Sequence, residues 1–390
     1  MNRRLGPEGI QGIGGGGLVS AESERNLQIA EDLCLKGRPN DAAPYLMKAL
    51  EDPNNVDADI QMSYLSNDLF FSIEVLELAE KKARTLLINR LGPSCFDDGG
   101  PCVGKFYEII LTRPYMRVLQ ALVRMCFETK QYEKGANIII EMLRLCPEDN
   151  LTQRFWLGPF LIRIGRAADA LFFCQMWIHT ARNDHGIPIR GGTVFQAPSS
   201  QLLTPETEER YSKHAACDLV HTAALAAFKL WGNCPQAAQL LRIAVGTNPD
   251  ILAKIVARRA QPAKGKMTPG RGFNGPDEAH DYLWMAQDLW MEPDVCNWVN
   301  EDPTVEKEVL KCCSRPECPA QETAAIQFKR CSSCHQVMYC GAACQKADWK
   351  RHKPECLKQV EYKKNMKNIL KNKPTTSLVY VLRGGVVHPI

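Results

Sequence analysis

The segment from Cys331 to Cys356, CSSCHQVMYCGAACQKADWKRHKPEC, holds five cysteines and two histidines. Thiolates and imidazoles at short, repeated spacings are the ligands that zinc accepts in small protein modules. Two further candidate ligands, Cys313 and Cys318, lie upstream, and Cys312 competes with Cys313 for the first position. The candidates form four pairs, and two pairs complete one tetrahedral site. The spacing therefore predicts two structural zinc ions with no open coordination position.

A segment of this size cannot bury enough apolar surface to fold alone. Metal binding is therefore expected to supply its folding free energy. His335 directly follows Cys334. We interpret His335 as a bystander, because the other candidates already complete both ligand sets.

The order of the ligands discriminates between double-zinc modules. RING and PHD fingers place their histidine fourth or fifth, whereas His352 is the seventh ligand here. The string YC-x3-CQ-x3-W-x2-H-x3-C, which begins at Tyr339 and ends at Cys356, closely resembles the MYND zinc finger. The resemblance covers residues 312–356. Its first knuckle departs from the family pattern, because four residues instead of two separate its cysteines.

The resemblance implies an interleaved pairing of the ligands. One zinc ion would take Cys313, Cys318, Cys340 and Cys344. The other would take Cys331, Cys334, His352 and Cys356. The irregular first knuckle leaves open whether Cys312 replaces Cys313.

The resemblance also implies a function. MYND fingers bind partner proteins, often through short proline-containing peptides, and are not mainly readers of DNA. By position, the peptide groove would involve Ser332, Gln345 and Trp349. The Trp349 indole offers a flat apolar face to a proline ring, and Ser332 and Gln345 can hydrogen-bond a peptide backbone. The alternative is that Trp349 is a core residue of the small finger.

Upstream of the finger, apolar residues recur at three and four from about residue 21 to residue 260, which predicts helices. Two stretches, Tyr115 to Asn150 and His221 to Asp250, read as helix, turn, helix and closing proline, and resemble tetratricopeptide repeats. The fold class predicted is mainly α, a tetratricopeptide-like region followed by a double-zinc MYND finger. Stacked helix pairs usually offer a concave surface to a partner peptide, or they only build a helical domain.

The remaining segments complete the predicted organisation. Residues 1–20 read as a flexible glycine-rich terminus and 261–276 as a glycine- and proline-rich linker or loop. The tryptophans of 277–305 are expected to anchor helices in the core. The basic tail, 357–390, reads as a solvated helix face, with a nucleic-acid patch as the alternative.

Composition sets limits on function. The chain has 390 residues and a net charge of +4, from 48 basic and 44 acidic residues, which does not argue for nucleic acid as the general partner. The N-terminal sequence has no apolar h-region, which argues against a secretory signal peptide. No run of 18 apolar residues occurs, which argues against a membrane span. Seventeen cysteines then indicate a reducing compartment. We expect an intracellular protein, nuclear or cytoplasmic, that is neither secreted nor embedded in a membrane.

Enzyme motifs occur only as near misses. GGPCVGKF has Phe106 where a P-loop needs Ser or Thr, and DEAH at Asp277 follows a loop instead of a strand. We expect a non-enzymatic adaptor whose finger recruits one partner while the helical region holds another, with a role in transcriptional regulation. The alternatives are an enzyme of unrecognised type in the helical region, with a SET-type methyltransferase less favoured, and a nucleic-acid binder that uses the lysine-rich tail.

Overall fold

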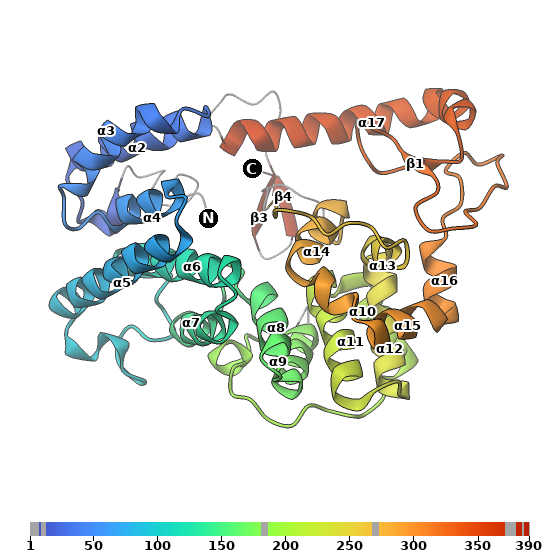
Figure 1. The fold of residues 1–390 in the computed structure, drawn as a ribbon, viewed down its shortest axis with the longest axis horizontal. Helices are drawn as coiled ribbons and strands as arrows, with labels where there is room; N and C mark the ends of the chain where they lie inside the picture. Colours follow the sequence, from blue (N-terminus) through green and yellow to red (C-terminus); the bar gives the residue numbers. More distant parts are fainter. Residues whose placement is uncertain are drawn as a thin grey trace. The chain divides into compact units, whose positions relative to one another are not determined.

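The computed structural model is drawn as a ribbon in Figure 1. It describes residues 8, 13–180, 186–266, 273–370, 380–383 and 386–389. The chain divides into two compact units, Met1–Pro198 and Ser199–Ile390. The described residues are mainly helical, which confirms the predicted fold class, and the predicted region 21–260 extends over both units. Among them, no helix is both long enough and apolar enough to cross a bilayer.

The first unit is a succession of helices. They are α2 (Ala21–Leu35), α3 (Pro39–Leu50), α4 (Val56–Leu65), α5 (Leu69–Leu91), α6 (Arg113–Glu128), α7 (Tyr132–Leu145), α8 (Arg154–Arg163) and α9 (Ala167–Thr180). Short 3-10 turns are η2 (Gly15–Gly17), η3 (Pro93–Phe96), η4 (Ile110–Thr112) and η5 (Ile189–Gly192). Each α-helix packs on the next along the chain, which is the nearest-neighbour packing typical of helical repeats. A specific tetratricopeptide assignment stays a prediction.

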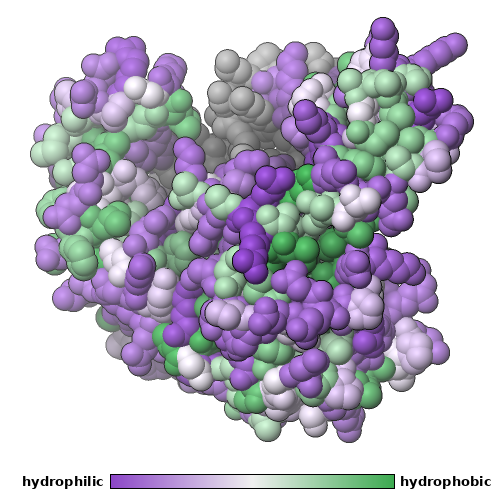
Figure 2. All heavy atoms as spheres, turned by 45° about the vertical axis from the view of Figure 1, so that its right-hand side comes forward, coloured by the Kyte–Doolittle hydropathy of each residue, from purple (hydrophilic) through white to green (hydrophobic). Residues whose placement is uncertain are grey.

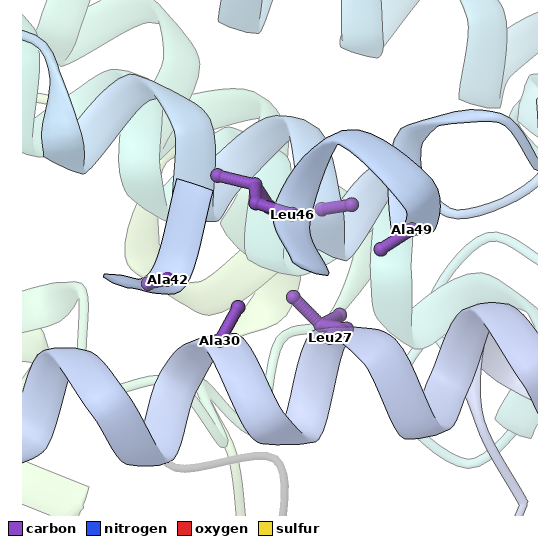
Figure 3. Packing of buried hydrophobic residues seen from close by; sticks show 6 residues of the cluster. Leu27, Ala30, Ala42, Leu46 and Ala49 are labelled. Carbon is purple, nitrogen blue, oxygen red and sulfur yellow. The ribbon is translucent and has the colours of Figure 1, made fainter. Parts of the chain in front are cut away.

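Small residues set the spacing of the first helix pair. Figure 3 shows Leu27 and Ala30 of α2 facing Ala42, Leu46 and Ala49 of α3. All five side chains are buried. Three alanines among them let the two backbones approach, and the leucines fill the remaining space.

Gly135 produces a similar close approach between α7 and its neighbours. A Cβ atom placed on Gly135 would lie 2.3 Å from Phe160 Cε2 and 3.2 Å from Cys126 Cβ. The Phe160 ring is fully buried and stacks on Phe127 with ring centroids 6.0 Å apart. Glycine at position 135 of α7 is therefore required by packing.

The described part of the N-terminal segment packs closely on its neighbours within the first unit, and the predicted flexibility of residues 1–20 as a whole stays a prediction. Gly16 is buried with a left-handed backbone, φ 72°, and a Cβ there would lie 3.1 Å from the backbone of Leu111. Glycine content therefore reflects close packing at η2 as well as conformational freedom. Apart from residue 8 and 13–20, the predicted segment lies outside the described residues.

A buried ion network joins this segment to the helices. The guanidinium of Arg117 donates to Glu8 at 2.7 Å and to Asp57 at 2.7 Å. Side chains of all three residues are at least nine-tenths buried. Two carboxylates neutralise one desolvated cation, which is the arrangement that a buried arginine requires.

The second unit contains the remaining helices and the strands. Its helices are α10 (Pro205–His214), α11 (Cys217–Trp231), α12 (Pro235–Thr247), α13 (Pro249–Val256), α14 (Pro276–Trp290), α15 (Pro293–Glu301), α16 (Pro303–Val309) and α17 (Ala342–Leu370). Six of them begin with proline, whose fixed φ and missing N–H suit the first helical position. The predicted linker 261–276 lies largely between α13 and α14, and its residues 267–272 are outside the described residues.

The tryptophans of 277–305 pack in the core of the second unit, as expected. Trp290 is fully buried and its indole N–H donates to the hydroxyl of Tyr282 at 3.0 Å. Trp298 stacks on Phe228 with ring centroids 4.4 Å apart. The Trp290 indole also meets the ring of His221 in α11 edge-on at 6.1 Å, so Trp290 and Trp298 anchor α14 and α15 on α11.

The strands are short. In the finger, β1 (Lys329–Arg330) pairs antiparallel with β2 (Met338–Tyr339), with Lys329 opposite Tyr339. Near the C-terminus, β3 (Tyr380–Arg383) pairs antiparallel with β4 (Val386–Pro389). The basic segment after residue 356 begins as a continuation of α17, which ends at Leu370. The predicted boundary between finger and tail therefore falls inside one helix.

Candidate metal centre

The first group of candidate ligands comes together from three segments. Cys313 and Cys318 lie on the loop after α16, Cys340 directly follows β2, and Cys344 is in the first turn of α17. The Cys340 sulfur lies 3.7 Å from that of Cys318 and 3.5 Å from that of Cys344. All four sulfurs lie within 4.8 Å of one another. The unusually long first knuckle therefore still closes.

The second group combines a knuckle and a helix. Cys331 and Cys334 follow β1, while His352 and Cys356 lie one turn apart on α17. The Cys331 and Cys356 sulfurs are 3.9 Å apart, and Cys334 Sγ lies 3.4 Å from Nε2 of His352. All four side chains are buried. Their donor atoms all lie within 4.8 Å of one another.

These separations fit zinc. A tetrahedral ion with Zn–S bonds of about 2.3 Å has neighbouring sulfurs about 3.8 Å apart. The three sulfur–sulfur distances given above, 3.5, 3.7 and 3.9 Å, lie close to this value. No disulfide joins any of these thiols. Four sulfurs in one group and three sulfurs with an imidazole in the other therefore suit two structural zinc ions.

Cys312 and His335 stay outside both groups. Cys312 is exposed and its backbone forms a bridge with Gln321, so Cys313 is the residue that enters the first cluster. His335 is exposed and has a left-handed backbone, φ 62°. The geometry thus favours Cys313 at the position that the sequence left open, and it agrees with the interpretation of His335 as a bystander.

Two thiols of the second cluster have pKa values shifted in opposite directions. Burial acts to raise the pKa of Cys331, but hydrogen bonds from the backbone of Cys334 and Ser333 outweigh it and bring the pKa down to about 6. Burial and the neighbouring thiols raise the pKa of Cys356 to about 11. One thiol therefore ionises readily while another holds its proton. Zinc binding requires all of them as thiolates and so releases protons.

Glu322 holds the loop between the two knuckles and could not be recognised from the ligand spacing. Its carboxylate is buried and accepts the backbone N–H of Phe328 at 2.6 Å and that of Lys311 at 2.9 Å. Lys311 precedes the first knuckle and Phe328 precedes β1. A single side chain therefore ties together the two ends of the segment from Lys311 to Phe328.

The three residues assigned to a peptide groove lie around one pocket. Ser332, Gln345 and Trp349 line a cavity of about 350 Å³, which we call the tryptophan pocket. Lys346 also borders it. Trp349 is 40% exposed, and its indole meets the ring of His352 edge-on at 6.0 Å. The indole is thus supported from behind by a zinc ligand while one face remains accessible.

A third group in the described residues has possible ligand atoms within 4.8 Å, namely Cys217, Asp218 and Glu278. Cys217 Sγ lies 3.7 Å from Asp218 and 3.9 Å from Glu278. Burial and these carboxylates raise the pKa of the Cys217 thiol well above its usual value. The thiol therefore stays protonated as a hydrogen-bond donor, which makes the group a polar core cluster.

Comparison with known proteins identifies the C-terminal module. The MYND finger family matches residues 311–356. The chain is similar to F-box protein At5g50450 of Arabidopsis thaliana, with 42% identity over 60 residues, which are 15% of this chain and 18% of that protein.

Two other relatives are named for a SET domain or for a methyltransferase activity. SET domain-containing protein 14 of Caenorhabditis elegans is 50% identical over 34 residues, 9% of this chain and 8% of that protein. Histone-lysine N-methyltransferase ASHR1 of Arabidopsis thaliana is 55% identical over 29 residues, 7% of this chain and 6% of that protein. The chain thus spans only a small part of the length of the relatives that it matches, and no solved structure matches it. The matched sequence and the two ligand clusters agree, and residues 311–356 are a MYND zinc finger.

Proposed function

We propose that the finger recruits partner proteins by holding a proline-containing peptide in the tryptophan pocket. The observation that carries the proposal is the convergence of Ser332, Gln345 and Trp349 on one cavity next to the second zinc cluster. MYND fingers are protein-interaction modules, and the half-exposed indole supplies an apolar face for a proline ring.

The zinc clusters support both walls of this pocket. Ser332 lies between the ligands Cys331 and Cys334, and Gln345 directly follows the ligand Cys344. Trp349 is on the same helix as His352. Metal binding at the two sites therefore holds the polar and apolar contacts in place before a peptide arrives, which reduces the entropy lost on binding.

The test compares Trp349→Ala with Leu357→Ala in the full chain. Leu357 is also exposed on α17 and does not border the pocket, so it is a matched control. The probe is a fluorescein-labelled peptide with two prolines flanked by apolar residues, measured by fluorescence anisotropy. We expect Trp349→Ala to weaken binding by about tenfold or more and Leu357→Ala to leave it unchanged. Equal affinity of both variants, with zinc content preserved, would refute the pocket.

We also propose that the chain is an adaptor with a second binding surface in the first unit. A cavity of about 650 Å³ lies between α5, α6 and α7 and is bordered by Glu77, Arg84, Tyr115 and Glu141. Proteins captured by the Trp349→Ala variant should then be a subset of those captured by the wild type. If the Trp349→Ala variant captured no protein at all, the finger would be the sole recruiting surface and the second surface would be refuted. Reporter assays with and without this substitution would test a role in transcriptional regulation.

The proposal treats both zinc sites as structural and the chain as non-enzymatic. Each cluster offers four protein ligands, a set that leaves no position for a substrate or an activated water. Similarity to the SET-domain relatives covers only the short finger region. Turnover of a methyl donor or a nucleotide by the purified full chain would contradict this part of the proposal.

An intracellular location belongs to the same proposal. All 17 cysteines are free thiols, and many of them are buried in apolar surroundings. Thiols in such number persist in a reducing compartment. Imaging of the tagged full chain would test this, and would also decide between nucleus and cytoplasm.

A further inference from the structure

A second, larger cavity lies within the second unit, between the finger and helices α13 and α14. Its volume is about 800 Å³, and we call it the finger–helix cavity. Its basic walls come from separate segments and include Lys254, Lys266, Lys311, Arg330 and Lys363. It shares no lining residue with the tryptophan pocket. The two cavities are therefore separate candidate binding sites.

Positive charge exceeds negative charge in this cavity, because five lysine or arginine residues face three acidic ones. The acidic side chains already have partners. Asp250 pairs with Arg330, and Asp277 pairs with Lys266 at 3.4 Å. Glu322 accepts backbone N–H groups, as described above. Within the described residues these acids form no ion pair with Lys254 or Lys311, and their charges offset only part of the pKa shifts of these lysines.

Lys254 contributes a partly buried cation to the cavity. It lies on α13, one turn after Asp250, and is half-buried. Within the described residues, its ammonium group has no hydrogen bond or ion pair. Burial lowers the pKa of Lys254, the charge of Asp250 offsets part of this shift, and the charges of Arg330 and Lys266 lower the pKa further. A carboxylate that enters the cavity would relieve both effects.

Lys311, which follows α16, has a similar environment in the same cavity. Its ammonium donates to the carbonyl oxygen of Glu308 at 2.7 Å, a neutral acceptor. Burial lowers the pKa of Lys311. Lys254 and Lys311 thus line one cavity, and among the described residues no carboxylate is hydrogen-bonded to either ammonium group. The cavity is therefore complementary to an anion with more than one charge.

Apolar side chains separate these charges. Phe273, Ile326, Phe328, Met338 and Tyr362 also line the cavity. In the view of Figure 2, hydrophobic and hydrophilic side chains are interspersed over the visible surface of the molecule. A small, fully hydrated anion would leave the apolar part of the wall uncovered. A peptide with acidic and apolar side chains matches both parts of the lining.

Backbone strain gathers at the same cavity. Three of its lining residues that are not glycine have left-handed backbones, namely Asn274 with φ 52°, Ile326 with φ 62° and His335 with φ 62°. For Ile326 this conformation is costly, because its side chain is β-branched. Such strain persists where the surroundings enforce it, and it is enriched at binding sites.

We propose that the finger–helix cavity is a second recognition site, which binds a peptide segment that carries aspartate or glutamate together with apolar side chains. The site does not depend on the tryptophan pocket, so the chain can read two different sequence features of its partners. Charge complementarity at Lys254 and Lys311 provides the selection for acidic residues.

The experiment measures binding of a fluorescein-labelled peptide in which glutamate alternates with leucine, by fluorescence anisotropy with the zinc-loaded full chain. The matched control peptide has glutamine in place of glutamate. The variants are Lys254→Gln and Lys311→Gln, and the matched control variant is Lys350→Gln, which changes an exposed lysine outside the cavity. Lys254→Arg keeps the charge and tests whether a loss reflects the charge or the fold.

We expect Lys254→Gln and Lys311→Gln each to lower the affinity for the acidic peptide by about tenfold. Lys254→Arg and Lys350→Gln should retain most of the affinity. The affinity of the wild type should also fall as salt is added. Equal binding of the glutamate and glutamine peptides would overturn the proposal, and so would unchanged binding by Lys254→Gln. Displacement of the peptide by citrate at comparable affinity would show that the site takes small anions and that the peptide assignment is wrong.

Trp349→Ala separates this proposal from the function proposed for the tryptophan pocket. This variant should bind the acidic peptide as the wild type does while it loses the proline-containing peptide. Loss of acidic-peptide binding in Trp349→Ala would contradict the independence of the two sites. Failure of the proline-containing peptide alone would leave the finger–helix cavity unaffected.

Discussion

The phenol of Tyr339 donates a 2.7 Å hydrogen bond to the buried carboxylate of Asp348. Tyr339 immediately precedes the ligand Cys340, and Asp348 lies on α17 between two zinc ligands. The same carboxylate accepts from Arg351 at 2.7 Å, and Arg351 also donates to the carbonyl oxygen of Ser314 at 2.8 Å. One set of hydrogen bonds therefore ties the first knuckle, β2 and the ligand-bearing helix together.

Replacement of Tyr339 by phenylalanine should loosen this arrangement without removing a ligand. Second-sphere partners of metal ligands typically change metal affinity by about 10- to 100-fold. We expect Tyr339→Phe to lose zinc about tenfold faster to a chromogenic chelator. Tyr362→Phe changes a more exposed tyrosine of α17 and is the control. Identical rates for the two variants would mean that the Tyr339 hydroxyl does not stabilise the finger.

The first knuckle yields a prediction about stoichiometry. Cys313 lies in the first cluster and Cys312 does not, so Cys312→Ser should keep two zinc ions per chain. Cys313→Ser leaves that cluster with three protein ligands and should lower its zinc occupancy. Elemental analysis after gel filtration in the presence of a weak chelator measures both. The opposite pattern would show that Cys312 is the ligand.

Arg330 of β1 pairs with Asp250 of α13, so the finger is linked to the helical part of the second unit. Both side chains are largely buried. In a double-mutant cycle with Arg330→Gln and Asp250→Asn, we expect a coupling free energy of about 1 to 3 kcal/mol. Tryptophan fluorescence during denaturant unfolding is a suitable probe, because five of the seven tryptophans lie in the second unit. Additive effects would show that the pair does not contribute to holding the finger in place.

Gly135→Ala tests the close approach in the first unit. The added methyl group would overlap the buried ring of Phe160, although alanine is the better helix former. Overpacking of this kind costs about 1 to 3 kcal/mol, so we expect a net loss of stability and a lower melting temperature. Gly341→Ala adds a methyl group where nothing lies within 4 Å, so it should be nearly neutral. A Gly135→Ala variant as stable as the wild type would show that α7 and α8 can separate at little cost.

His221 predicts a pH dependence of stability. The side chain is fully buried; its Nδ1 lies 2.8 Å from the carbonyl oxygen of Cys217, and its Nε2 has no hydrogen-bond partner among the described residues. Burial lowers the pKa of His221 from 6.5 to about 4. The folded state therefore holds the neutral imidazole, whereas the unfolded chain takes up a proton as the pH falls below about 6.5.

His221 should accordingly support stability fully above pH 6.5, and this contribution should be lost progressively as the pH falls to about 4. The loss amounts to at most about 3 kcal/mol, since one pKa unit corresponds to about 1.4 kcal/mol. His221→Phe removes the titrating group but keeps an aromatic ring beside Tyr282 and Trp290. The difference in unfolding free energy between wild type and variant should depend on pH in this window. A constant difference would mean that His221 does not titrate with folding.

Much of the finger could be predicted because its determinants are local. The second cluster needs only a knuckle and two residues one turn apart on a helix, so the spacing from Cys331 to Cys356 already contains its geometry. Proline at the first position of several helices is local in the same way. The choice between Cys312 and Cys313 could not be made from the sequence, because neither cysteine has the family's spacing to Cys318 and only the path of the loop separates these adjacent residues.

The sequence by itself determined the mainly helical class and the zinc ligand pairs, since helix periodicity and metal coordination both act over a few residues. Only the tertiary structure decided the division at residue 198, the burial of Gly16, the pairing of Asp250 with Arg330, and the gathering of lysines around the finger–helix cavity. These features join residues far apart in the chain. Their free energy depends on which surfaces the whole fold brings together, and no local pattern carries that information.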